Sequence, residues 1–290
     1  KDKDRTTQPY GPELANRRAW SLKSSYMTTL LRTRVFSQEE QESIAKTAQD
    51  TSKPFTQIIE EKLLKYRGQS EKELCKEFDV NFNAKGRNST LVRKILGLSS
   101  DIDSTAEFKK ANMNIRAIRV NKNGLPKEDS PFKNYHFIEL ANEKEWEESH
   151  IYTEIFSRKF MFVVFRENET GNFCLDQVKF WGFPDSLEPE LVRVWQETKE
   201  IINQGVKLTV KPNGEDGVKV STNFPQSKAN EYLFTKVHAS QTYYEVKPGE
   251  FVGKGKLKDT DELPDGRHIT KHSFWLPKKF VQQILRGEWD

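Results

Sequence analysis

Cysteine is scarce in this chain, and the shortage excludes two classes of protein. Cys75 and Cys174 are the only thiols among 290 residues, and they lie far apart, without CxxC or Cys/His ligand spacing. A small disulfide-stabilised secreted domain needs several paired cysteines, and a structural zinc site needs closely spaced Cys or His ligands. We therefore expect two buried free thiols in a reducing compartment, and no zinc site.

Long apolar runs are also missing. No stretch approaches the roughly 20 apolar residues that span a bilayer, and no secretory signal peptide opens the sequence. These absences predict a soluble, intracellular protein that makes no membrane contact. The sequence opens with KDKDRTTQPYG, without an initiator Met, so we expect a fragment of a longer polypeptide.

Common catalytic signatures are not found either. The five His residues lack metal-ligand spacing, and His268 and His272 are expected in a loop. Neither a glycine-rich phosphate loop nor a G-x-S-x-G motif occurs. The sequence therefore offers no P-loop, zinc-protease or serine-hydrolase site.

Apolar and charged residues are both plentiful. The chain is 35% hydrophobic, with 19 Phe and 6 Trp, which is enough for one large core or two small ones. Lys and Arg number 47 against 43 Asp and Glu, a formal charge of +4. This excess permits a polyanionic partner without requiring one, because only a clustered basic patch gives a strong field.

The first fifty residues read differently from the rest. Residues 12–34 predict a basic helix with its apolar side chains on one side. Ser37 and Glu40 form a capping box that predicts a second helix as far as Gln49. The TSKP stretch at residues 51–54 then predicts a boundary.

From Phe55 the pattern is that of an α+β domain with a mixed or antiparallel sheet. The apolar periodicities predict, in chain order, helices at 55–68, 70–78 and 89–98, strands at 114–120, 134–140 and 159–168, a helix at 188–204, strands at 206–211, 218–222 and 231–239, and a strand followed by a helix at 273–285.

One strand has the spacing of a nuclease site without its chemistry. We expect Thr105 to Pro126 to be a strand that turns back on itself, with Asn114 and Arg116 on one face. Metal-dependent DNA hydrolases place an acid on one strand and E-x-K on the next, but here an amide and a guanidinium stand instead. The alternative is an ordinary edge strand with Arg116 and Arg119 solvated. A second E-x-K order, Glu245 and Lys247, lies between turn residues without an upstream acid.

Basic and aromatic residues interleave in two later stretches. These candidates for phosphate and base contacts are Lys228, Lys236, His238 and Ser240 in the first stretch and Lys271, His272, Trp275, Lys278 and Lys279 in the second. Taken singly, each lysine is more typical of a solvated surface. Proximity of the two stretches in the fold would favour a DNA-binding surface.

Taken in order, these pieces resemble the MutH family, which includes the mismatch-repair nicking endonuclease and GATC-cutting type II restriction enzymes. The resemblance covers about Pro54 to Ile284 and carries KGRNSTLVRKILGL, AEFKKANMNIRAIRVNKNGLP, NEYLFTKVHASQ and SFWLPKKFVQQIL. It implies a MutH-like, type II restriction endonuclease-like fold with a central mixed sheet flanked by helices.

The family's metal site is degenerate in this sequence. Its helix acid falls on Arg93, its two strand acids on Glu107 and Asn114, and its lysine on Arg116. One carboxylate remains of three, so we expect no catalytic residues, no metal and no cofactor in this domain. Restoring a single residue should not rescue cleavage, because the ligand set is lost as a unit.

The family's DNA-binding features survive better. Lys85 matches a family lysine near the phosphates, and Trp275 stands in place of a family tyrosine. The family's R-P-K is here Lys236-Val237-His238, which puts the reading of bases in doubt. The residues expected to bind DNA are Lys85, Arg87, Arg116, Lys228, Lys236, His238, Ser240, Trp275 and Lys278.

The resemblance also implies a division of labour. Residues 1–51 resemble a basic linker and the tail of a preceding MutH-like domain, and residues 52–290 a silent DNA-binding copy. The parent would be a bacterial, cytoplasmic restriction enzyme whose upstream copy cuts double-stranded GATC with Mg²⁺. This copy would bind DNA as an allosteric effector, and the protein could dimerise on the DNA. The alternatives are that this chain is itself a Mg²⁺-dependent endonuclease, or that it only supports folding or dimerisation.

Overall fold

The computed structural model describes residues 5–8, 11–16, 27, 31, 42–44, 52–212 and 217–290. At the start, β1 (Arg5–Gln8) and β2 (Gly11–Asn16) pair antiparallel as a hairpin. The helix predicted from residue 12 is therefore wrong for residues 12–16, which pair with β1 as a strand. The apolar pattern of such a short run fits a helix and a strand equally well. The rest of that prediction, apart from Met27 and Leu31, lies outside the described residues.

The helix predicted for residues 37–49 is also wrong where it is described. Glu42, Ser43 and Ile44 are not helical. The Glu42 carboxylate accepts backbone N–H groups of Ser99 and Ser100, both at 2.9 Å, and these hydrogen bonds lower its pKa to about 2. Contacts with distant residues thus fix this segment, and the remainder of the predicted helix lies outside the described part of the chain.

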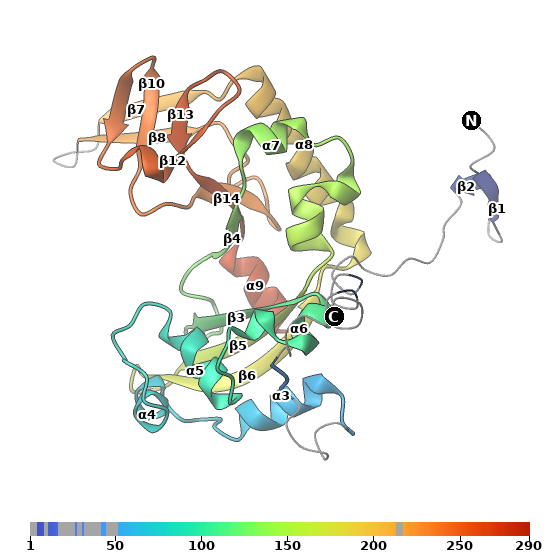
Figure 1. Ribbon diagram of the computed structural model, residues 1–290, viewed down its shortest axis with the longest axis vertical. Helices are drawn as coiled ribbons and strands as arrows, with labels where there is room; N and C mark the ends of the chain where they lie inside the picture. Colours follow the sequence, from blue (N-terminus) through green and yellow to red (C-terminus); the bar gives the residue numbers. More distant parts are fainter. Residues whose placement is uncertain are drawn as a thin grey trace.

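A mixed sheet of β3 (Met113–Val120), β5 (Lys159–Glu167) and β6 (Phe173–Gly182) lies at the centre of the lower half of the molecule in Figure 1. β3 runs parallel to β5, and β6 runs antiparallel to β5 on its other side. β3 is therefore an edge strand. The continuous apolar run predicted as a strand at 159–168 is confirmed as β5, which is buried on both faces.

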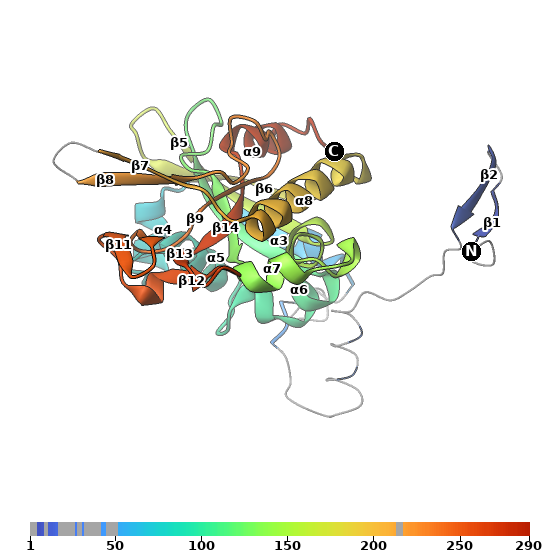
Figure 2. The same ribbon diagram turned by 90° about the horizontal axis from the view of Figure 1, so that it is seen from above.

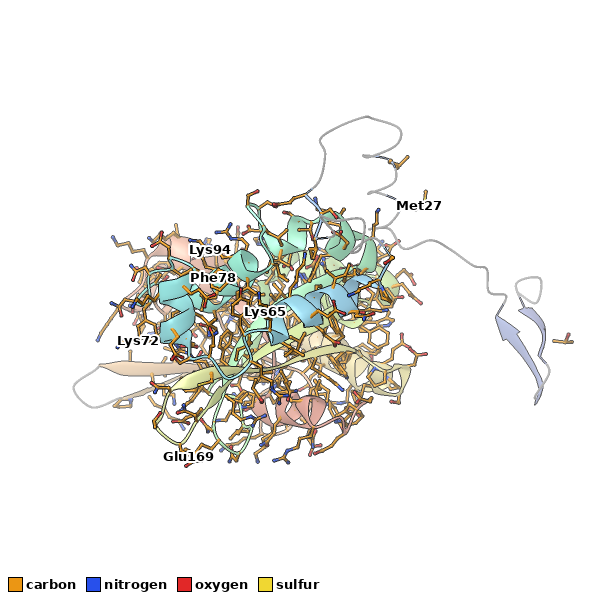
Figure 3. The ribbon with its side chains drawn as sticks, turned by 90° about the horizontal axis from the view of Figure 1, so that it is seen from below. Met27, Lys65, Lys72, Phe78, Lys94 and Glu169 are labelled. Atoms are coloured by element: carbon orange, nitrogen blue, oxygen red, sulfur yellow. The ribbon has the colours of Figure 1, made fainter. Side chains whose placement is uncertain are left out.

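Short helices accompany this sheet. They are α3 (Phe55–Leu64), α4 (Glu71–Glu77), α5 (Arg87–Ile95) and α6 (Ala106–Ala111), with a 3-10 turn at Ile102–Ser104 before α6. The predicted capping box of α4 is confirmed, since Ser70 and Glu73 exchange hydrogen bonds. Lys94 of α5 donates to the carbonyls of Phe78 and Asp79 where α4 ends, at 2.8 and 2.7 Å, and Figure 3 shows Lys94 beside Phe78.

The upper half of Figure 1 is built from small sheets and two helices. β4 (Ser130–Asn134), β14 (His272–Leu276) and β9 (Phe234–Val237) pair in that order. The two-stranded pairs are β7 (Leu208–Pro212) with β8 (Val218–Thr222), β10 (Tyr243–Lys247) with β11 (Glu250–Gly253), and β12 (Thr260–Glu262) with β13 (His268–Thr270). Helices α7 (Phe137–Asn142) and α8 (Glu188–Gln204) lie beside them, and α9 (Lys278–Leu285) follows β14.

Two hydrophobic cores meet at β5. Its side chains alternate, so that Phe160, Phe162 and Val164 enter a core shared with α7, α8 and α9, while Met161, Val163 and Phe165 enter a core shared with α3 and α5. Burying each such side chain contributes about 1.5–3 kcal/mol. One strand therefore holds the two halves in a single unit, and the mixed α and β architecture expected from the sequence is confirmed.

Two strand predictions are wrong because short helices replace them. Residues 106–111 form α6, whose Phe108 is fully buried and whose C-cap Asn112 has φ 51°. Residues 137–142 form α7, with Phe137 and Leu140 buried three apart, a helical spacing. The predicted strand at 134–140 is represented only by β4, which ends at Asn134.

Some smaller expectations can also be compared with the fold. His268 and His272 lie in strands β13 and β14 rather than in a loop, since both strands pair with neighbours. Cys75 and Cys174 are free thiols, the first buried and the second half-buried. Within the described ranges, the molecule has no helix long and apolar enough to cross a membrane.

Candidate nucleic-acid interface

A hollow of about 780 Å³ opens beside the edge strand β3. We call it the β3 hollow. It is lined by the start of α5 (residues 85–89), the middle of β3 (115–119), the segment 126–131 before and within β4, and Phe173. Its charged lining residues are Lys85, Arg87, Arg116, Arg119, Lys127, Glu128 and Asp129. Cations thus outnumber carboxylates on its wall.

Two arginines of the hollow are held by one buried carboxylate. Glu71, only 3% exposed, accepts from Arg119 Nε at 2.7 Å, from Arg87 Nη2 at 3.2 Å and from Asn88 Nδ2 at 2.7 Å. Arg119 also lies over the ring of Phe173, 4.9 Å from its centroid. A buried carboxylate with two guanidinium groups leaves a net positive charge facing the hollow. Arg119 is therefore held by Glu71 and Phe173, whereas the edge-strand alternative expected it to be solvated.

The start of α5 adds polar donors to the same wall. No side chain caps its first turn, which follows Gly86, and Arg87 Nε donates to no acceptor among the described residues. Uncapped N–H groups at a helix start, together with the helix dipole, favour an anion. Exposed Lys85 stands just before this turn. The arrangement is suited to a phosphate group.

Arg116 is enclosed rather than solvated. Its guanidinium lies 4.7 Å from the ring centroid of Phe132 and 5.9 Å from that of Phe160, and Nη1 donates to the carbonyl of Pro131. Burial lowers its pKa to about 10, while the charge of Asp103 opposes that shift. Arg116 therefore stays a cation at neutral pH and packs as part of the fold.

The neighbouring polar groups, which with Arg116 we call the β3 centre, are Asp103, Asn114 and Arg158. Asp103 accepts from Asn114 Nδ2 and from the N–H of Ile115, both at 3.1 Å. Arg158 Nη1 donates to Asn114 Oδ1 at 3.1 Å. Each potential oxygen ligand at this point is thus hydrogen-bonded to a protein donor, and two guanidinium groups lie where a divalent cation would need negative charge. These residues do not fit a magnesium site.

Two of the residues aligned with the family acids lie elsewhere. Glu107, expected on the strand, is on α6 and accepts from Ser43 Oγ and from the N–H of Ile44 at 3.1 Å. Arg93 of α5 donates to the carbonyls of Leu98 and Ser99, at 3.1 and 2.7 Å. The prediction that Glu107 lies on a strand is therefore wrong, because residues 106–111 are helical, and Asp103 is the carboxylate that contacts Asn114.

The second cluster of candidates lies on β9 and β14. These strands pair antiparallel, with Lys236 opposite Ser273, so the two basic and aromatic stretches are brought together. We call Lys236, His238, Trp275 and Lys278 the β9–β14 surface. Lys236 Nζ lies 4.8 Å from the Trp275 ring centroid, and the His238 ring packs at 5.3 Å against the same indole. Lys236 and Lys278 are exposed.

Asp129 joins the hollow to this surface. It lines the β3 hollow, and its carboxylate accepts from the N–H of Lys278 at 3.0 Å and contacts Lys236 Nζ at 3.4 Å. His238 provides a second link, since burial lowers its pKa and the positive charges of Arg116 and Lys85 lower it further. The hollow and the surface are therefore parts of one basic interface formed by both halves of the molecule.

The other two candidates stand apart from this interface in their contacts. Lys228 is in an exposed turn whose Asn230 accepts from Arg193 of α8 at 2.8 Å. Ser240 is exposed in the loop that leads from β9 to β10. Glu245 is not a metal ligand, since its carboxylate accepts the N–H groups of Gly249 and His268. Among the residues that the structure describes, no group of three or more His, Cys, Asp or Glu is placed to hold a metal ion.

Sequence reasoning missed several residues of the interface. Glu71, Asp103, Arg119, Lys127 and Asp129 were not singled out as site residues, although Arg119 shares the alternation of β3. The partners of Asp129 are Lys236 on β9 and Lys278 on α9, which lie 107 and 149 positions away. The local sequence pattern around Asp129 carries no information about them.

Comparison with known proteins gives one relationship. No protein-family model matches the chain. The chain is 30% identical over 299 residues to the type II restriction enzyme Sau3AI of Staphylococcus aureus. The match covers 95% of this chain and 60% of the length of that enzyme. The chain is therefore a distant homologue of a type II restriction enzyme and corresponds to part of it.

Proposed function

We propose that residues 52–290 form a MutH-like, double-stranded DNA-binding domain that does not cleave DNA. The parent is a longer type II restriction endonuclease in which an upstream copy cleaves GATC sites with Mg²⁺, and this domain is the effector of that copy. The observation that carries the proposal is the continuity between the β3 hollow and the β9–β14 surface through Asp129.

The charge and geometry of the interface support DNA as the ligand. A duplex presents phosphates in two rows, and neutralising them with Lys and Arg supplies sequence-independent affinity. Exposed Lys85, Lys127, Lys236 and Lys278 stand on different segments around the interface, where each can contact a phosphate. The relationship to a restriction enzyme favours the same ligand.

The β3 centre supports the proposed lack of cleavage. Hydrolysis needs a metal held by carboxylates, but Asp103 and Asn114 are engaged by protein donors and face two arginines. A guanidinium at Arg116 also cannot act as a base, because it remains protonated. A site without excess carboxylates repels phosphate less, so the loss of chemistry is compatible with retained binding.

The effector role rests on tethering. If residues 1–51 continue a preceding catalytic domain, binding of one site here raises the effective concentration of nearby DNA for that domain. Coupling beyond this would need two conformations with different affinities for DNA. Dimerisation on DNA would add a further tether of the same kind.

Electrophoretic mobility shifts with a GATC duplex and a scrambled duplex at one salt concentration test the proposal. We expect the wild-type chain to bind duplex DNA, with preference for GATC, and a Lys85→Glu/Lys236→Glu variant to bind at least tenfold more weakly. Lys110→Glu/Lys144→Glu is the matched control, because both lysines are exposed on α6 and after α7 and neither lines the interface.

Each alternative has a distinct outcome. Metal-dependent nicking or linearisation of a plasmid by the purified chain would establish an active endonuclease and reject the silent domain. Equal, negligible binding of both duplexes would leave a role in folding or dimerisation. Converting Asn114→Glu and Arg116→Lys together should not produce cleavage, because Arg158 still occupies the metal's surroundings.

A further inference from the structure

A lysine-rich loop lies beyond the interface described above and has no assigned role. The segment Gly253–Lys258, with the sequence GKGKLK, follows β11, and we call it the lysine loop. Lys254, Lys256 and Lys258 are exposed, and Leu257 between them is 57% exposed, more than any other exposed large hydrophobic residue described. The loop therefore presents three cations and one apolar side chain to solvent, a combination that can contact both the phosphates and the sugars of a nucleic-acid backbone.

The glycines fix this loop against the chain that carries Ser240. Gly253 has φ +123°, and a Cβ there would collide with the carbonyl oxygen of Thr242. A Cβ on Gly255 would lie 3.0 Å from Cβ of Tyr243 and 3.1 Å from the carbonyl oxygen of Gln241. The N–H of Gly255 donates to the carbonyl of Thr242 at 3.0 Å. Only glycine permits this close approach, so the lysine loop and the β9–β10 loop form one surface.

The far end of the loop is also held in place. The buried Asp259 carboxylate accepts the N–H of Lys256 at 3.0 Å, and the hydroxyl of Thr260 donates to the carbonyl of Leu257 at 2.7 Å. These hydrogen bonds hold the backbone, while the lysine and leucine side chains remain exposed. A rigid backbone that presents flexible cations loses less entropy on binding a polyanion than a mobile loop would.

Lys271 connects the loop to the interface. Its Nζ donates to the carbonyl of Lys258 at 2.8 Å, and its own carbonyl accepts the N–H of His238 at 2.8 Å. The positive charge therefore continues from the β9–β14 surface through Lys271 to the lysine loop. In Figure 1 and in Figure 2, β12 and β13 of the upper half and α4 and α5 of the lower half lie toward the same side of the molecule, the left of both views.

We propose that the lysine loop is a second contact to the DNA backbone, outside the β3 hollow. Lys254, Lys256 and Lys258 neutralise phosphates of the duplex held at the interface, and Leu257 packs against its sugars. This inference rests on the proposed function. It predicts a footprint that extends past the interface and a contact that carries no sequence preference, because phosphates are read without regard to base.

Salt-dependent binding by a Lys256→Glu/Lys258→Glu variant tests the contact. We expect at least tenfold weaker binding, equal for GATC and scrambled duplexes, and a logarithmic salt slope smaller by about 2. A Leu257→Ser variant should weaken binding less and leave the slope unchanged. Lys110→Glu/Lys144→Glu controls for total charge, and circular dichroism checks that each variant is folded.

The outcomes distinguish failure of the lysine-loop contact from failure of the proposed DNA-binding function. If Lys85→Glu/Lys236→Glu weakens binding and Lys256→Glu/Lys258→Glu leaves affinity and slope as in the wild type, the lysine loop is no contact and the DNA-binding function stands. If the folded wild-type chain binds neither duplex, both are rejected. A loss confined to GATC would also overturn the backbone contact, since it would mean that the loop reads bases.

Discussion

The β3 centre and the β9–β14 surface both contain positively charged side chains, but these side chains differ in their exposure and their partners. At the β3 centre, Asn114, Arg116 and Arg158 are enclosed and hydrogen-bonded to protein groups. On the β9–β14 surface, Lys236 and Lys278 are exposed on a frame of packed aromatic rings. Polar groups used inside the fold contribute to stability, whereas exposed ones remain available to a ligand. The comparison assigns structure to the first region and recognition to the second.

The contacts of the β3 centre also explain how this part of β3 is stable without a metal ion. Arginine at position 116 brings its own positive charge and stacks on Phe132 and Phe160, so the region needs no metal to balance it. The amide of Asn114 bridges Asp103 and Arg158. Each of these residues has a partner inside the protein, and β3 pairs with β5 along its whole length.

The largest expected effect tests the structural side of the comparison. Glu71→Ala should lower the free energy of unfolding by about 3–5 kcal/mol, because it leaves Arg87 and Arg119 without their buried carboxylate. Urea unfolding followed by fluorescence measures it. Glu71→Gln keeps an acceptor and should cost less, and Glu73→Ala, which removes only the exposed capping box, about 1 kcal/mol. Equal losses at positions 71 and 73 would contradict the buried network.

A second effect concerns the buried foundation of the β9–β14 surface. His272 of β14 is 2% exposed, Nδ1 lies 2.7 Å from the Thr270 carbonyl, and burial lowers the pKa of the imidazole to about 4. The unfolded chain has a His pKa near 6.5, so it binds the proton more readily. Stability is therefore complete above pH about 6.5 and falls by up to about 3 kcal/mol as the pH drops towards 4.

Unfolding in urea at pH about 7 and about 4.5 measures this dependence. His272→Gln should lose part of the acid sensitivity, whereas His136→Gln, at an exposed residue that contacts Asp261, should keep it. An acid sensitivity unchanged by His272→Gln would show that other groups cause it.

The pattern of success and failure in the sequence reading has a physical basis. The capping box of α4 and the apolar run of β5 are local signals, and both predictions hold. Short helices such as α6 and α7 provide fewer than two turns of periodicity, and both were taken for strands. The family's arrangement of an acid on one strand and E-x-K on the next presupposes a strand through Glu107. Residues 106–111 form a helix instead, so that carboxylate was misplaced.

The sequence predicted which residue types belong to the candidate site better than it predicted which residues contact each other there. Lys236, Trp275 and Lys278 stand together because β9 pairs with β14, and their segments had been singled out. Asp103, Asp129 and Glu71 act through residues 11 to 149 positions away. Such partners depend on how the chain folds back, which a single sequence does not display. The exposed Lys228 was selected by the same rule as Lys236, but it lies in a turn whose Asn230 is hydrogen-bonded to Arg193 of α8.

Asp129 provides a smaller effect on the recognition side. It is a carboxylate inside a basic interface, where it holds Lys236 and opposes a phosphate. Asp129→Asn should strengthen duplex binding by about threefold to tenfold, because a like charge is removed while the amide oxygen still accepts the N–H of Lys278. Fluorescence anisotropy at about 0.1 M salt measures it. Weaker binding would mean that the Lys236 ion pair positions the lysine.

The smallest effect compares two lysines that the sequence did not distinguish. Lys278 lies next to Asp129 at the edge of the β3 hollow, whereas Lys228 occupies a turn anchored on α8. Lys278→Ala should reduce the logarithmic salt slope of duplex binding by about 1, the value for one lost phosphate contact, and should leave the free energy of unfolding nearly unchanged. Lys228→Ala should change neither the salt slope nor the free energy of unfolding, since its turn contacts α8 and not the interface. Equal salt slopes for the two variants would show that the β9–β14 surface binds DNA no differently from any other basic surface. A smaller slope only for Lys228→Ala would indicate that DNA binds near α8 instead.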